Sequence, residues 1–82
     1  MMLDAKQLDA LSRAGAVKDV IVIGVSGGFL VQINDQNTIE AKRGQPRVFK
    51  KLNAAATFLK TRGIGSFKVD TARWEPAQRP LV

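Results

Sequence analysis

The apolar run at residues 20–25, Val-Ile-Val-Ile-Gly-Val, most constrains what this chain can fold into. β-Branched side chains fit a pleated strand. Because the run is apolar on both faces, it predicts a central strand, or a strand covered on both sides, at residues 17–25. A membrane-spanning helix needs about 20 apolar residues, so we expect no membrane span and no membrane partner.

Two turns divide the segment that follows. Residues 26–28, Ser-Gly-Gly, form a tight turn, and the short gap predicts a β-hairpin with a second strand at residues 29–34. Residues 35–37 form another turn before a third strand at residues 38–42. An apolar strand followed by Gly-Gly also resembles a nucleotide-binding loop, but phosphate binding there requires a helix directly after the turn. We therefore interpret the motif as a hairpin.

A first helix is predicted at residues 4–14. Asp4 is placed to cap it, and Gln7 stands three residues later, in the position of a capping box. Leu8 and Leu11 share one face, and Gly15 ends the helix. A helix this short is marginal alone, so we expect it to cover an edge of the sheet or part of its other face.

A second helix is predicted after Asn53, a good N-cap residue, and begins with three alanines. Ala55, Phe58 and Leu59 share its apolar face. Lys60 and Arg62 fall in its last turn, where positive charge complements the helix dipole. Gly63 is expected in the left-handed conformation that ends a helix, so that Ile64 folds back onto the apolar face.

After Gly65 the period of the apolar pattern changes to two, which predicts a last strand with Phe67 and Val69 inward. We also expect Val48 and Phe49 to pair briefly with the sheet. The predicted fold is α+β in the order α-β-β-β-α-β, an antiparallel sheet with a helix packed on one face. Residues 1–74 form a single compact α+β domain, and residues 75–82 form a flexible C-terminal tail.

Several kinds of chemistry lack their usual residues in this chain. It has 82 residues and contains neither cysteine nor histidine, so disulfides, thiolate metal sites and the commonest general base are absent. The acidic residues show no catalytic spacing. We therefore expect a protein that is not an enzyme and needs no cofactor and no metal. The lack of cysteine and of a secretion signal fits the cytoplasm.

Positive charge is concentrated in the second half of the chain. The formal net charge is +6, of which residues 1–41 contribute −2 and residues 42–82 contribute +8. A basic segment lies around a loop between the third strand and the second helix, and its members are Lys42, Arg43, Arg47, Lys50 and Lys51. This segment is suited to contacts with DNA phosphates. The alternative is a solvated surface that keeps a small protein soluble, and the sequence leaves both interpretations open.

The chain has one tryptophan, Trp74, directly after the last strand. It either closes over an edge of the core or anchors a protein partner, because tryptophan is enriched at the centres of interfaces. Unpaired edges of a four-stranded sheet also favour a homodimer.

Much of residues 1–74 resembles a family of small ParC-type partition-associated proteins from proteobacterial plasmids and mobile elements. The matching stretches are Met-Leu-Asp-Ala-Lys-Gln-Leu-Asp-Ala-Leu at residues 2–11, Lys-Arg-Gly at 42–44, Arg-Val-Phe at 47–49, Leu-Asn-Ala-Ala-Ala-Thr-Phe-Leu at 52–59, Gly-Ile at 63–64 and Phe-Lys-Val-Asp at 67–70. These are packing, capping and turn residues. The resemblance implies a role in plasmid or mobile-element maintenance and supplies no binding residues.

Two functional hypotheses follow. The first is an accessory maintenance or partition protein that binds DNA non-specifically through the basic loop. The second is an adaptor that binds other maintenance proteins, through a sheet edge or Trp74, and has no affinity for nucleic acid.

Overall fold

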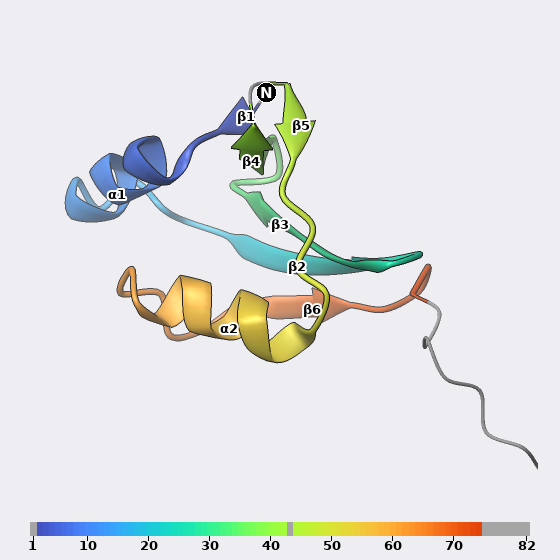
Figure 1. The fold of residues 1–82 in the computed structure, drawn as a ribbon. Helices are drawn as coiled ribbons and strands as arrows, with labels where there is room; N and C mark the ends of the chain where they lie inside the picture. The colour runs from blue at the N-terminus through green and yellow to red at the C-terminus, as the bar shows by residue number, and fades with distance from the viewer. Residues whose placement is uncertain (1, 43, 75–82) are drawn as a thin grey trace, which may run out of the picture.

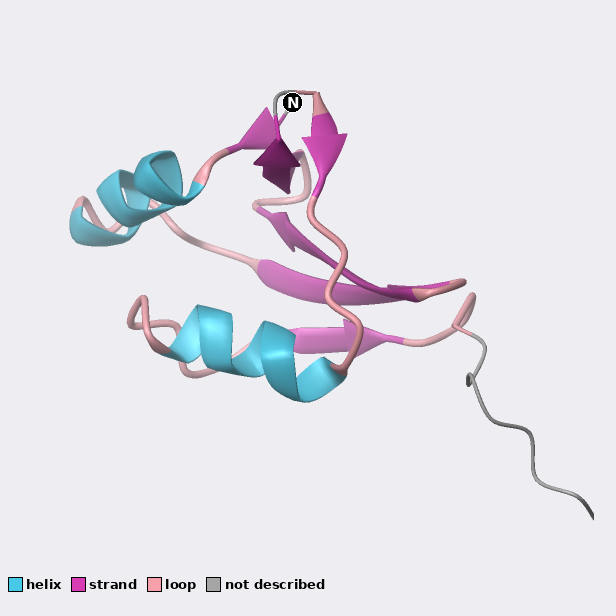
Figure 2. Ribbon diagram, in the orientation of Figure 1, coloured by secondary structure: helices cyan, strands magenta, loops and turns pink. Residues whose placement is uncertain are grey.

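The computed structural model describes residues 2–42 and 44–74. Figure 1 shows the elements in chain order: β1 (Met2–Leu3), α1 (Ala5–Arg13), β2 (Val20–Val25), β3 (Gly28–Ile33), β4 (Asn37–Lys42), β5 (Gln45–Pro46), α2 (Leu52–Lys60) and β6 (Lys68–Asp70). The strands form a sheet in the order β1-β4-β3-β2-β6, and β5 pairs with β4. Figure 2 distinguishes the helices from the strands. The α+β class is confirmed.

The sheet is mixed, so the prediction of an antiparallel sheet is wrong at two places. The pairs β2–β3 and β3–β4 are antiparallel, as a meander requires, but β1 runs parallel to β4 and β6 runs parallel to β2. Parallel neighbours need a crossover connection, and α2 lies within the connection that leads to β6. The predicted order also omits β1 and β5, whose two residues each are too few to show a period.

The strand β2 is central, as predicted, with β3 on one side and β6 on the other. It begins at Val20 rather than at residue 17, because the preceding loop is held by the side chain of Asn34. The Asn34 carboxamide accepts hydrogen bonds from the backbone N–H groups of Lys18 and Asp19 at 2.7 and 3.0 Å and donates one to the Ala16 carbonyl at 3.0 Å. The β3–β4 turn therefore fixes where β2 starts.

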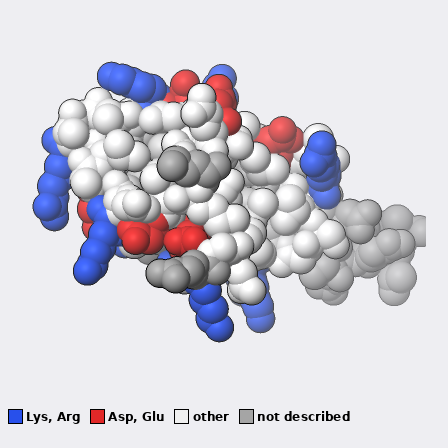
Figure 3. Space-filling view, turned by 90° about the horizontal axis from the view of Figure 1, so that it is seen from above, with Lys and Arg blue, Asp and Glu red and all other residues white. Residues whose placement is uncertain are grey.

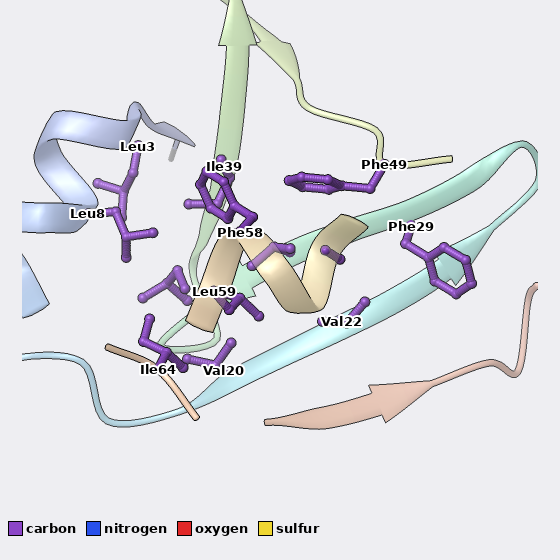
Figure 4. Packing of buried hydrophobic residues seen from close by; sticks show 13 residues of the cluster. Leu3, Leu8, Val20, Val22, Phe29, Ile39, Phe49, Phe58, Leu59 and Ile64 are labelled. Atoms are coloured by element: carbon purple, nitrogen blue, oxygen red, sulfur yellow. The ribbon is translucent and has the colours of Figure 1, made fainter. Parts of the chain in front are cut away.

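One face of the sheet carries the whole buried core of the described residues (Figure 4). Leu8 of α1 and Leu59 of α2 are both fully buried in the same cluster, together with Val22 and Val31. The two helices therefore cover the same face, with α1 next to the edge strand β1. Two positions were predicted for α1, at an edge of the sheet or on its opposite face, and the structure shows the edge position.

The capping of α1 is as predicted. The Asp4 side chain accepts from the backbone N–H of Gln7 at 2.8 Å, and the Gln7 side chain accepts from the backbone N–H of Asp4 at 2.9 Å. The left-handed Gly63 is also confirmed, with φ +83°, and the N–H of Ile64 donates to the Leu59 carbonyl at 3.0 Å. However, α2 ends at Lys60, so Arg62 lies beyond the last turn in which it was predicted. These local signals lie within a few residues of one another, and no distant contact overrides them.

The predicted start of α2 is wrong. Its N-cap is Lys51, which makes no side-chain capping hydrogen bond, and Asn53 lies inside the first turn. The reason is tertiary: Phe49 is fixed two residues earlier, because it pairs with Phe29 through backbone hydrogen bonds of 2.7 and 2.8 Å. Because Phe49 is fixed, the helix begins at Leu52, three residues later.

The segment from β5 to Phe49 (residues 45–49) pairs first with β4 and then with β3. It pairs with β4 at Glu40 and Lys42 and with β3 at Phe29, where the expected pairing of Phe49 is confirmed. The segment can be followed in Figure 1 from β5 to α2. Gly28 allows this approach, because a Cβ there would collide with the Phe49 carbonyl oxygen.

The last strand is an exposed edge. β6 contains three residues, and Val69 is 42% exposed although its register partner Val22 is fully buried. The expectation that Val69 is an inward, buried residue is therefore wrong, while Phe67 packs partly against the core. The predicted tail at residues 75–82 lies outside the described residues. No helix in the described part of the chain is long and apolar enough to cross a membrane.

Candidate functional site

The candidate site is a surface groove of about 610 Å³ between α2 and the segment that precedes it. We call it the basic groove. Its lining comprises cations, small polar side chains and two aromatic rings: Arg47, Phe49, Lys50, Lys51, Asn53, Ala54, Thr57, Phe58, Thr61 and Arg62. Of these lining residues, four are cationic and none is acidic. The floor is apolar, because Phe49 and Phe58 lie 5.3 Å apart between ring centroids.

Arg47 is held over this floor. Its guanidinium carbon lies 4.8 Å from the centroid of the Phe49 ring and 5.1 Å from that of Phe58. The backbone N–H of Arg47 donates to the Ile39 carbonyl at 2.7 Å, which fixes the base of the side chain. Cation–π contacts of this kind contribute about 0.5–1 kcal/mol at exposed sites. The charge of Arg47 is therefore positioned at the groove before any ligand binds.

Arg62, just after α2, is the fourth cation that lines the groove. Its guanidinium carbon lies 4.2 Å from the Phe58 centroid, and its Nε lies 3.3 Å from the Asp9 carboxylate of α1. This is the only ion pair within residues 2–42 and 44–74. Its side chains are 22% and 39% exposed, so solvent screens the pair and its contribution to stability is small. The pair nevertheless offsets part of the Arg62 charge.

The remaining cations of the groove have no such partner. In the described part of the chain, no carboxylate lies within ion-pair distance of Arg47, Lys50 or Lys51. All three residues are exposed. Lys50 and Lys51 directly precede α2, whose N-cap makes no side-chain hydrogen bond, and the Arg47 guanidinium lies over Phe49 and Phe58. Unpaired cations along one groove favour an anionic ligand.

The structure gathers three of the five predicted basic residues. Arg47, Lys50 and Lys51 line the basic groove, whereas Lys42 is an exposed residue at the end of β4 and does not line it. Arg43 lies outside the described residues. Figure 3, seen from above, shows basic side chains spread around the margin with acidic side chains between them, so charge is not continuous over that face.

Sequence reasoning missed Arg62 as a groove residue and attributed it to the helix dipole. Its place in the groove depends on how Phe58 sits beside Phe49, which is a tertiary contact between α2 and the segment after β5. A signal was present in the four-residue spacing of Phe58 and Arg62, which places them on one side of a helix or its extension.

Trp74 lies over the end of β2. Its ring centroid is 5.6 Å from that of Phe29, and a Cβ added at Gly24 would lie 2.5 Å from the Trp74 Cβ. The side chain thus covers the glycine beside the core, yet the residue remains 37% exposed. Trp74 thus packs at an edge of the core, as the first predicted alternative requires. It also leaves apolar surface exposed, as the second alternative, a partner anchor, requires.

Comparison with known proteins identifies the family. No curated protein and no solved structure matches the chain significantly. A family model described as ParC-like matches residues 3–78, a range that includes both helices, strands β2 to β6 and every residue of the basic groove. The resemblance to ParC-type proteins is confirmed. The chain therefore belongs to the ParC-like family, which associates it with small plasmid-related proteins.

Proposed function

We propose that this protein is an accessory factor in plasmid or mobile-element maintenance that binds DNA non-specifically. The contacts are made to the phosphate backbone by Arg47, Lys50 and Lys51 at the basic groove. Lys42 and Arg43 extend the same basic segment along the chain. The role is one of binding in the cytoplasm, without catalysis.

The observation that carries this proposal is the gathering of three unpaired cations along one groove beside α2. A cation already paired with a carboxylate must lose that partner before it contacts a phosphate, whereas Arg47, Lys50 and Lys51 have no such cost. Each phosphate neutralised releases condensed counterions, which supplies most of the free energy of non-specific binding. Arg47 is also held by two rings, which reduces the entropy lost on binding.

The proposed contacts do not read the base sequence. The phenylalanine rings at Phe29, Phe49 and Phe58 are only 4%, 5% and 8% exposed, so they offer no face on which a base can stack. Stacking platforms require exposed aromatic faces, and base-edge reading in duplex DNA usually requires an element inserted in a groove of the duplex. The described surface supplies charge instead, which supports binding without sequence preference.

The proposal is tested by fluorescence anisotropy with a labelled random-sequence duplex at about 50 and 200 mM salt. The charge-removed variant is Arg47→Gln/Lys50→Gln/Lys51→Gln. The matched control is Lys6→Gln/Lys60→Gln/Lys68→Gln, which removes the same charge from positions outside the basic groove. We expect the first variant to lose most of its affinity and the control to lose much less. Equal losses would attribute binding to net charge and refute a local site.

A second candidate function is an adaptor that binds another maintenance protein through the surface around Trp74. The observation that favours it is the position of Trp74, which covers Gly24 of β2 and remains 37% exposed. Tryptophan at such a position is typical of interface anchors. Sedimentation of the wild type and of Trp74→Ala tests this candidate. If the variant is folded and assembles as the wild type does, Trp74 is not an assembly anchor.

A further inference from the structure

We propose that the basic groove also docks an acidic amphipathic helix of a partner protein, in competition with DNA. This goes beyond the proposed function, because phosphate contacts need only the cations at the rim. They leave unexplained an apolar floor along one side of α2.

The floor has the shape of a helix-docking surface. Ala54, Thr57 and Thr61 follow one another at spacings of three and four residues, so they form one exposed stripe of small side chains along α2. Beside this stripe lie the Phe49 and Phe58 rings, which are only 5% and 8% exposed and complete the apolar floor of the groove. Small side chains allow a second helix to approach to about 8–10 Å between axes, and a groove of this type accepts apolar side chains at helical spacing.

The charges of the groove select the occupant. Lys50 and Lys51 stand directly before α2, and the guanidinium groups of Arg47 and Arg62 both lie over the ring of Phe58 in its last turn. The lining residues include no carboxylate. Nine helical residues span roughly 13 Å, so the complementary ligand is a helix of about three turns with acidic side chains near both ends. Charge complementarity thus excludes a basic or neutral helix and a second copy of this basic chain's α2.

Duplex DNA does not fit the same description. Its phosphates are strongly hydrated and gain nothing from an apolar floor, and a rigid duplex cannot enter a groove of about 610 Å³. DNA and an acidic helix therefore share the rim cations but only the helix uses the floor. Binding of the partner consequently displaces DNA. This competition rests on the proposed DNA binding, whereas the docking itself does not.

The test uses a fluorescein-labelled peptide of about 14 residues, designed with leucine at positions i, i+3, i+4 and i+7 and glutamate at both ends. A scrambled peptide of the same composition is the control. The protein variant Ala54→Gln/Thr57→Gln fills the floor without changing charge, and both positions are exposed, so the fold is retained and is checked by circular dichroism. We expect this variant to bind the amphipathic peptide roughly tenfold more weakly and the random duplex within about twofold of wild type.

The outcomes separate the two proposals. The inference is supported if the wild type binds the amphipathic peptide, the floor variant does not, and the peptide displaces DNA. Three results would each overturn docking. They are no binding of the amphipathic peptide up to about 1 mM, equal binding of the scrambled peptide, and unchanged affinity of the floor variant for the amphipathic peptide. If the wild type binds the peptide but does not bind DNA at low salt, the proposed function and the competition are refuted, whereas the docking site stands.

Discussion

The substitution Gly28→Ala tests whether the segment that carries the groove cations is fixed by its approach to β3. A Cβ at this position would collide with the carbonyl oxygen of Phe49, a backbone atom that cannot rotate away, and would lie 2.7 Å from a Val48 methyl carbon. Relief requires the Phe29–Phe49 bridge to open, which breaks two backbone hydrogen bonds. It also displaces Phe49, a core residue that is 5% exposed.

The magnitude follows from these contacts. Two net hydrogen bonds contribute about 1–3 kcal/mol, and the positive φ of Gly28 adds about 1–2 kcal/mol of strain for alanine, which together give about 2–5 kcal/mol. Gly27→Ala is the matched control, since Gly27 also has a positive φ but a Cβ there meets no atom within 4 Å. We expect the control to cost only about 1–2 kcal/mol of strain.

Urea unfolding followed by circular dichroism measures both variants against wild type. A domain of this size has a stability of about 3–5 kcal/mol, so Gly28→Ala is expected to be partly unfolded at 25 °C and is also measured at lower temperature. Equal destabilisation by the two substitutions would refute the reasoning, because it would show that the close approach of Phe49 to Gly28 contributes nothing.

Three further predictions concern the described contacts. Asn34→Gly should destabilise the protein by about 1–2 kcal/mol through loss of the carboxamide hydrogen bonds. Asn34→Ala should cost about 1 kcal/mol more, because alanine is strained at the φ of +54° found there. Equal thermal midpoints for the two variants would contradict this backbone strain. Asp4→Ala should cost about 0.5–2 kcal/mol by removing the capping box, measured by urea unfolding with Asp19→Ala, which removes a carboxylate that caps no helix, as the control. Gly24→Ala should push Trp74 off the sheet and shift its emission, the only tryptophan signal, to longer wavelength; an unchanged spectrum would show that Trp74 does not lie there.

Local signals predicted the parts of this fold that depend on neighbouring residues. The Asp4–Gln7 capping box, the β2–β3 hairpin and the left-handed Gly63 all involve residues a few positions apart, and the structure confirms them. The burial of Ala55, Phe58 and Leu59 was also predicted, because helical period alone places them on one face.

Features that depend on distant contacts were not predictable in this way. The parallel pairing of β1 with β4 joins residues far apart in the chain, and a two-residue strand has no alternation to detect. Asn53 is a good N-cap by propensity, but the anchoring of Phe49 on Phe29 decides where α2 begins. Tertiary contact overrode local preference at that position.

The candidate site shows the same division. The basic segment was visible as charge, and three of its members meet at the groove. The apolar floor and Arg62 were not visible, because they require Phe49 and Phe58 to be brought together from different elements. A charge pattern therefore predicted the electrostatic character of the site but not its shape.

The salt dependence of DNA binding tests the central claim most directly. The measurement compares the slope of log K against log salt for the wild type and for Arg47→Gln/Lys50→Gln/Lys51→Gln. If the three cations each contact a phosphate, the slope of the variant is smaller in magnitude by about 2.7, at about 0.9 per contact. A wild type that does not bind at about 50 mM salt, or a variant with an unchanged slope, would contradict phosphate binding at the basic groove.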